Sequence, residues 1–355
     1  MLKTSLVEFK EQLHMLRNHF EVYEKHQFLV KEIIAKPLQV LSAAENDYIK
    51  LYNKNSTHER QLEYISNIVY LYSSLERFVE NIIEEYVREI NLLYPDFNNV
   101  NGKLHDYYLS NLMKLYDKSH YAKFSKWTIE KIAANLHDVV IENKCVMMGE
   151  CFLPNAGNYT HRKIREALEK FNIQGLSQSL SNCEPLKTFL LEHDKEISND
   201  KFEAIDVVTD RRNEVAHKGG VSDILTHSYL NDYSIAIEKY SESLVTILND
   251  SLLRTKWEVL KKQGHMIYAK NNYFSIIDVY SFNSANARLK VGMKALVLLS
   301  KKSVPSMFEL KVNSIHQDIN GKTEIVDEIN EKDVTVFSVH FDSKVIGIKK
   351  CMFFD

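Results

Sequence analysis

The hydrophobic residues between positions 57 and 93 recur at steps of three and four, which is the period of an amphipathic helix. We expect one long helix there, about 50 Å in length at 1.5 Å per residue, ended by the turn Tyr94-Pro95-Asp96. Pro37 is expected to divide the preceding region, residues 4–54, into two helices. The remaining helices are expected near 105–118, 124–141, 161–171, 185–193, 200–218 and 225–262. Thr160 is the expected cap of the helix 161–171, Gly219-Gly220 end the helix 200–218, and apolar residues mark the last helix.

After about residue 264 the pattern changes to short β-branched and aromatic runs separated by turn signals, at Asn283, Asn320-Gly321 and Asp342-Ser343. Six or seven strands are expected in this part, most simply closed into a small barrel. The predicted fold class is α+β with separate domains. An all-helical bundle with an N-terminal helical extension covers residues 1–262, and a small β-barrel covers residues 265–355.

Opposite charges nearly balance in this chain of 355 residues, with 45 Lys and Arg against 48 Asp and Glu. A protein that coats nucleic acid without sequence preference is usually basic, because phosphate neutralisation dominates its affinity. Any contact with nucleic acid is therefore expected to be local. The N-terminus has charges every few residues, and no run approaches the roughly 18 apolar residues of a membrane helix. These observations predict a cytoplasmic protein without membrane contact.

Four cysteines, Cys145, Cys151, Cys183 and Cys351, are scattered without a paired spacing, which predicts reduced and buried thiols. Cys145, Cys151 and His161 come into consideration as metal ligands, but their spacing matches no common zinc pattern. We therefore predict neither a metal ion nor another cofactor.

One segment of the predicted helix 200–218 combines residues suited to RNA chemistry, namely Arg212, Asn213 and His217, followed by Gly219-Gly220. Asn213 and His217 are four residues apart and share a helix face, and Arg212 lies about 100° round, within reach of the same ligand. Histidine moves protons near neutral pH, and a guanidinium suits the charge that develops on phosphorane oxygens. Because RNA carries its own nucleophile, the 2′-hydroxyl, this segment predicts RNA cleavage without a metal-bound nucleophile.

Basic residues near this motif and in a second helix have two interpretations. Arg and His at a helix C-terminus also interact favourably with the helix dipole, and a charge run of one turn is usually a solvated face. Glu76 is likewise expected to be a solvated charge rather than a partner of Arg212. On the other interpretation these basic side chains contact RNA, and the candidates are Arg211, Lys218, His161, Arg162, Lys163 and Arg165.

Residues 211–220, RRNEVAHKGG, resemble the R-x(4–6)-H motif of the HEPN superfamily, in particular of its RiboL-PSP branch from bacterial conflict systems. Residues 70–87 are similar to the early long helix of that family, and residues 155–173 to its middle segment. The resemblance implies a helical bundle that forms a homodimer, with two motifs facing each other in one composite cleft. It also implies metal-independent cutting to a 2′,3′-cyclic phosphate, with Arg212 and His217 as the catalytic pair and Asn213 as a polar supporter.

The C-terminal strands are similar to the β-barrel second domain of translational GTPases, although no Gly-rich phosphate loop accompanies them. Taken together, the sequence predicts an RNA endonuclease that acts as a toxin or antiviral effector and is restrained by an inhibitor or another defence-system partner. Two alternatives stay open. One is a noncatalytic HEPN-fold interaction protein in a defence or toxin–antitoxin complex, and the other is a DNA-handling helper in a restriction-like system.

Overall fold

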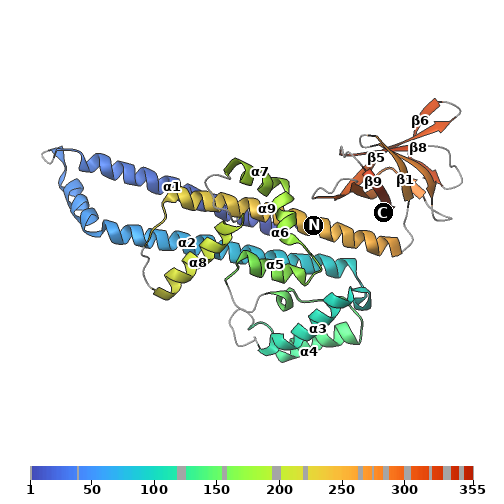
Figure 1. Ribbon diagram of the computed structural model, residues 1–355, viewed down its shortest axis with the longest axis horizontal. Coiled ribbons are helices and arrows are strands. Elements are labelled where there is room, and N and C mark those ends of the chain that lie inside the picture. Colours follow the sequence, from blue (N-terminus) through green and yellow to red (C-terminus); the bar gives the residue numbers. More distant parts are fainter. Residues whose placement is uncertain are drawn as a thin grey trace.

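The computed structural model describes most of the chain, and within the described residues nine α-helices precede nine β-strands (Figure 1). None of the helices in this part has a stretch long and apolar enough to cross a lipid bilayer. The described ranges are 2–37, 40–117, 125–153, 158–193, 201–218, 223–262, 267–273, 276–282, 288–299, 305–319, 322–330, 337–343 and 348–354.

Three long helices, α1 (Thr4–Ile34), α2 (Ala43–Leu93) and α9 (His227–Lys262), pack side by side (Figure 1). α1 and α2 form an antiparallel hairpin that extends beyond the start of α9. Helix α2 ends before the predicted turn, but it begins at Ala43 rather than at residue 57. The reason is a capping box, in which Ser42 Oγ accepts a hydrogen bond from Glu45 N at 3.2 Å and Ser42 N donates to Glu45 Oε2 at 2.8 Å.

Shorter elements pack against this body. The predicted cap at Thr160 is confirmed, because its side chain accepts a hydrogen bond from Lys163 N at 3.3 Å. Gly175, with a φ of 65°, precedes a helix that the sequence pattern did not predict. These elements are η2 (Phe97–Asn99), α3 (Gly102–Asp117), α4 (Ile129–Val140), η4 (Gly149–Phe152), α5 (His161–Glu169), α6 (Leu176–Asn182), α7 (Glu184–His193) and α8 (Glu203–Lys218).

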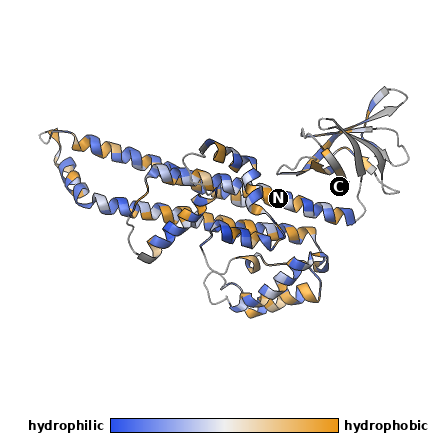
Figure 2. Cartoon of the chain, in the orientation of Figure 1, coloured by the Kyte–Doolittle hydropathy of each residue, from blue (hydrophilic) through white to orange (hydrophobic). Residues whose placement is uncertain are grey.

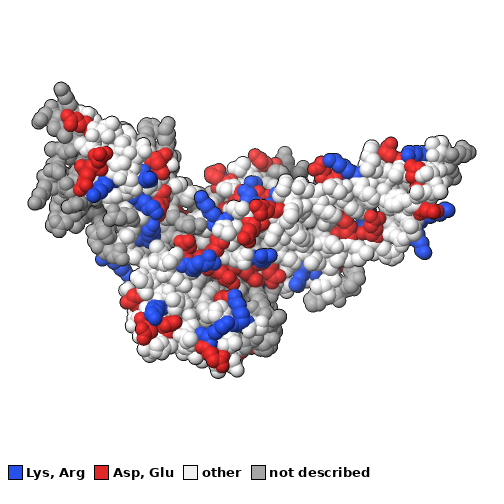
Figure 3. Space-filling model, turned by 180° about the vertical axis from the view of Figure 1, so that it is seen from behind, with Lys and Arg blue, Asp and Glu red and all other residues white. Residues whose placement is uncertain are grey.

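Polar and apolar residues alternate along the long helices, as the sequence periodicity predicted (Figure 2). Acidic and basic side chains are interspersed on the face drawn in Figure 3, over both the helical part and the sheet. That mixture agrees with the expectation that any contact with nucleic acid is local.

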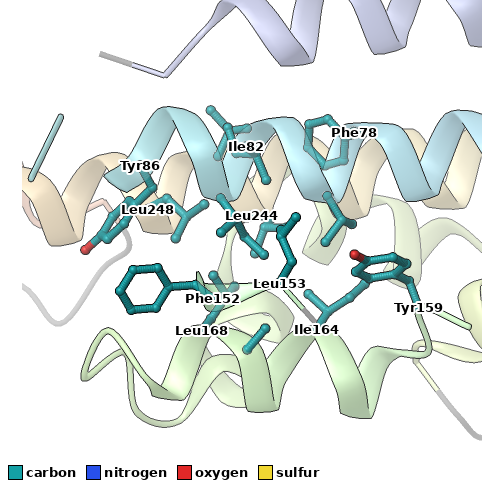
Figure 4. Close-up of a cluster of buried hydrophobic side chains, with 14 of the residues drawn as sticks. Phe78, Ile82, Tyr86, Phe152, Leu153, Tyr159, Ile164, Leu168, Leu244 and Leu248 are labelled. Atoms are coloured by element: carbon teal, nitrogen blue, oxygen red, sulfur yellow. The ribbon is translucent and has the colours of Figure 1, made fainter. Parts of the chain in front are cut away.

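The core of the helical part lies where α2 and α9 meet the segment that follows α4. Figure 4 shows Tyr86 of α2 and Leu244 and Leu248 of α9 near Phe152 and Leu168. Each of these five side chains is at most 2% exposed. Because burying a side chain of this kind contributes about 1.5–3 kcal/mol, this cluster fixes α2 and α9 against the shorter elements.

The strands form a seven-stranded sheet in the order β4-β9-β1-β2-β8-β5-β6, in which β4 also pairs with β5. The small β-domain is thereby confirmed. β1 and β9 meet through the single described pair Ile267 and Cys351, so closure into a regular barrel stays a prediction. The turn signals at Asn283 and Asn320-Gly321 lie outside the described residues. The strands are β1 (Ile267–Tyr273), β2 (Ile276–Phe282), β3 (Arg288–Lys290), β4 (Lys294–Leu299), β5 (Met307–Ile319), β6 (Lys322–Val326), β7 (Glu328–Asn330), β8 (Phe337–Phe341) and β9 (Ile348–Phe354).

The C-terminal half of α9 packs against this sheet. Leu253 and Trp257 of α9 share a buried cluster with Met307, Met352 and Phe354. The sheet is therefore attached to the helical part through the last helix of the bundle.

Candidate active site

Helix α8, which carries the candidate motif, packs against α2 and α9, and its C-terminal end projects from the side of the bundle (Figure 1). Ile205 and Val208 are buried on the inner face of α8, and Val215 packs partly buried against the same core. Thr209 is fully buried, and its hydroxyl donates to Ile205 O at 2.8 Å. The apolar face of α8 thus packs against the core, and the polar residues of the motif lie on the other faces of this helix.

The guanidinium of Arg212 is held by three neighbours. Its Cζ lies 4.8 Å from the centroid of the Tyr72 ring on α2, a cation–π contact. Its Nη1 donates to Asn213 Oδ1 at 3.1 Å and to Asn158 Oδ1 at 3.4 Å. We call Tyr72, Asn158 and Asn213 the Arg212 cradle. Asn213 is one of the candidate site residues of the sequence, whereas Tyr72 and Asn158 were not predicted as part of the site.

Asn158 is placed by the backbone, because it adopts a φ of 72°, a left-handed conformation that asparagine tolerates better than most residues. The backbone N–H groups of Asn158 and Tyr159 donate to the hydroxyl of Tyr72 at 2.6 and 3.2 Å. Tyr72 is a core residue of α2 and is 1% exposed. The Tyr72 ring also stacks against Arg212. This one buried side chain therefore links α2, the backbone at Asn158 and Tyr159, and α8.

Two carboxylates of α2 lie near Tyr72 and Tyr159. Glu76 follows Tyr72 by one turn of α2 and is partly buried. Burial first, and then the charge of Glu76, raise the pKa of Tyr72. Tyr159 donates its hydroxyl to Glu80 Oε1 at 2.8 Å. Glu76 and Arg212 therefore act on Tyr72 with opposite effects on its pKa.

Arg211, next to Arg212 in the sequence, contacts different residues. Its Nη1 lies 3.4 Å from Glu214 Oε2 and donates to Asp223 O at 3.1 Å, and its Nη2 lies 3.5 Å from Asp223 Oδ2. Arg211 thus ties α8 to the segment that precedes α9. The two adjacent arginines are not brought together in one site.

His217 and Lys218 belong to α8, but their side chains lie outside the described part of the structure, as does Gly219-Gly220. The helix places the backbone of His217 one turn beyond Asn213, on the same side. The convergence of His217 and Arg212 on one ligand therefore stays a prediction.

His161, one of the candidate RNA contacts, is buried, with 8% of its surface exposed. Its Nδ1 lies 3.1 Å from Tyr240 Oη and its Nε2 lies 2.8 Å from Ser177 Oγ. Its ring stacks on Phe202 at a centroid distance of 3.8 Å, and its backbone N donates to Asp206 Oδ1 of α8 at 2.8 Å. These contacts favour an interior role, in which His161 joins α5 to α8, over contact with RNA.

The other basic residues of α5 lie nearer the surface. Arg162 is exposed and lies 4.0 Å from Glu166, one turn along the helix. Arg165 lies 3.5 Å from Glu169 in the same way, and Lys163 is partly buried. Such pairs are typical of a solvated helix face, and contact of these three side chains with RNA stays a prediction.

The four cysteines are buried, as predicted. Among the residues that the structure describes, no three His, Cys, Asp or Glu side chains are grouped so that they could hold a metal ion.

A family model described as RiboL-PSP-HEPN matches residues 40–250, which is more than half of the chain. The match includes the whole of α2, the Arg212 cradle and the motif helix, whereas α1 and the sheet lie outside it. None of the curated proteins matches the chain.

Proposed function

Because the chain belongs to the RiboL-PSP-HEPN family, we propose that it is a metal-independent endoribonuclease with Arg212 and His217 as its catalytic pair. The observation that carries the proposal is the Arg212 cradle. A cation that is stacked on a buried tyrosine and hydrogen-bonded to two amides is already oriented, so little freedom is lost when it meets a phosphate.

The proposed reaction is transesterification within RNA. The 2′-oxygen forms a bond to phosphorus while the bond from phosphorus to the 5′-oxygen breaks, which leaves a 2′,3′-cyclic phosphate and a 5′-hydroxyl. One proton leaves the 2′-hydroxyl, and one proton is delivered to the departing 5′-oxygen. Arg212 stabilises the negative charge on the nonbridging oxygens, and the histidine carries the protons.

A homodimer suits this scheme, because each copy carries one His217 and the reaction needs both a base and an acid. The projecting end of α8 is the part of the helical domain on which two motifs would meet (Figure 1). We propose that the active form is a dimer with a composite cleft. Its specific activity should therefore fall on dilution, in parallel with the dimer fraction measured by light scattering.

Cleavage of labelled RNA by the purified chain in the presence of EDTA tests the proposal. We expect 2′,3′-cyclic phosphate ends with the wild type and loss of cutting in Arg212→Ala and His217→Ala. Matched controls are Arg77→Ala and His58→Ala, which change exposed side chains of α2 and should leave the rate unchanged. Undiminished cutting by both motif variants would refute the assignment.

We further propose a role as a toxin or antiviral effector that a partner protein restrains. Growth arrest on expression of the wild type, but not of Arg212→Ala, is the expected result. Cleavage of RNA but not of DNA, which lacks the 2′-hydroxyl, would separate this role from that of a DNA-handling helper. Intact RNA under all conditions would favour a noncatalytic interaction protein instead.

A further inference from the structure

A groove of about 810 Å³ lies between α1, α2 and the start of α9. The α1–α2 hairpin continues beyond the first residue of α9 (Figure 1), and the groove is lined by residues of both hairpin helices and of the region around the start of α9. Its volume falls within the range of about 300–1,000 Å³ that is usual for small-molecule sites. Aromatic and basic side chains occur together among its lining residues, which include Tyr23, Phe28, Lys31, Tyr52, Arg60 and His227.

A hydrogen bond between His227 and Glu63 fixes one wall of this groove. His227 Nε2 donates to the carboxylate of Glu63, with distances of 2.9 and 2.8 Å to its two oxygens. The His227 ring stacks on Phe20 and meets the Tyr23 ring edge-on at a centroid distance of 4.8 Å. Glu63 also accepts a hydrogen bond from Asn67. This wall is therefore rigid and holds Tyr23 in place.

The remaining lining is open to solvent and carries the binding chemistry. Phe28 is 62% exposed, although its ring is large and apolar. Lys31 and Arg60 are exposed cations, one from each helix of the hairpin, and Tyr52 donates to Gln27 Oε1 at 2.5 Å. Aromatic faces beside cations are the combination that binds nucleobases by stacking and phosphates by charge.

This groove is distinct from the Arg212 site. Tyr72 follows Glu63 by nine positions on α2, which is two and a half turns at 3.6 residues per turn. The two side chains therefore lie on opposite sides of the helix. One wall is α1, which lies outside the residues that the family model matches. Any function of the groove is therefore separate from the reaction proposed at the Arg212 site.

We propose that this groove binds a nucleotide, with the base against the rings of Phe28 and Tyr52 and the phosphate at Lys31 and Arg60. The nucleotide is either free or part of an RNA strand, since the two share the recognised chemistry. The proposal does not depend on the endoribonuclease activity.

Calorimetric titration of the full chain with AMP tests the proposal, with adenosine and ribose 5-phosphate as partial ligands. We expect AMP to bind at least tenfold more tightly than either partial ligand. Arg60→Ala and Phe28→Ala should each weaken AMP binding about tenfold or more, because each removes one half of the recognition. Lys50→Ala is the matched control, since this exposed residue lies on the same hairpin but not in the groove. Circular dichroism shows whether each variant is folded.

A hexa-adenylate with 2′-O-methyl groups, which lacks the nucleophile for cleavage, identifies the source of the nucleotide. Binding more than tenfold tighter than that of AMP, weakened by Arg60→Ala, assigns the groove to an RNA strand. Equal affinities assign it to a free nucleotide. Absence of AMP binding, or binding that Arg60→Ala and Phe28→Ala leave unchanged, overturns the proposal. The Arg212→Ala variant should bind AMP as the wild type does, which separates a failure here from a failure of the proposed nuclease.

Discussion

Replacement of Asp250 by alanine should weaken the attachment of the β-sheet to α9. The carboxylate of Asp250 accepts hydrogen bonds from the backbone N–H of Ser306 at 2.7 Å and of Met307 at 2.8 Å, with the same oxygen. It also accepts from Ser306 Oγ at 3.0 Å and from Arg254 Nε at 2.8 Å. Ser306 and Met307 are 6% and 3% exposed, so water does not readily replace the missing acceptor.

The size of the effect follows from these contacts. A buried donor left without an acceptor costs about 1–3 kcal/mol, and Asp250→Ala leaves two backbone donors in that state. The expected loss is therefore about 2–6 kcal/mol in the free energy that holds the sheet on α9. The ion pair with Arg254 is expected to add little to this free energy, because the Arg254 side chain is 53% exposed.

Trp257 provides the measurement, because it packs between α9 and the sheet, next to Met307. Its fluorescence during urea unfolding, in a Trp127→Phe background, reports the separation of the two parts. Asp250→Asn keeps an oxygen acceptor and should lose clearly less stability than Asp250→Ala. A loss below about 1 kcal/mol for Asp250→Ala would refute the reasoning, as would equal losses for the two variants.

Three further results are expected. Asn158→Gly preserves the left-handed backbone but removes the amide beside Arg212, so the single-turnover cleavage rate should fall about tenfold while thermal stability changes little. Burial alone would raise the pKa of Glu309, but the hydrogen bonds and charges of Lys256, at 2.7 Å, and Lys294, at 3.2 Å, together outweigh that effect and lower the pKa. The resulting stabilisation is present above the ordinary pKa of 4.5 and is lost as the pH falls through the folded-state pKa, and urea titrations of Glu309→Gln should lack this acid dependence. Gly149→Ala would place a Cβ atom 2.9 Å from Glu84 Cα, so the melting temperature should drop by an amount that corresponds to about 1–3 kcal/mol.

The sequence predicted the helices with strong periodicity more reliably than their ends. Helix α2 was expected only from residue 57, because residues 43–56 are largely polar and show weak periodicity. Its true start was marked by the spacing of Ser42 and Glu45, a capping box that precedes no hydrophobic run. Helix α6 is short and polar, so it gave no periodic signal.

The sequence could predict only the part of the candidate site that lies on a single helix, α8. The contact between Arg212 and Asn213 follows from their adjacency on α8. Tyr72 and Asn158 join it because α8 crosses α2 and the Asn158 segment, a tertiary arrangement that no local pattern encodes. The burial of His161 has the same kind of cause, because its charged neighbours in sequence pointed to the surface.

The two adjacent arginines of the motif have different contact partners on α8, and these partners suit them to different roles. Arg211 and Arg212 are about 100° apart on α8, so they meet different surroundings. Arg211 contacts the acidic residues Glu214 and Asp223 and holds the segment after the helix, which suits a structural role. Arg212 contacts two neutral amides and an aromatic face, which orient its guanidinium. A guanidinium oriented in this way loses little freedom when it meets a phosphate, so Arg212 is better suited than Arg211 to the proposed chemistry.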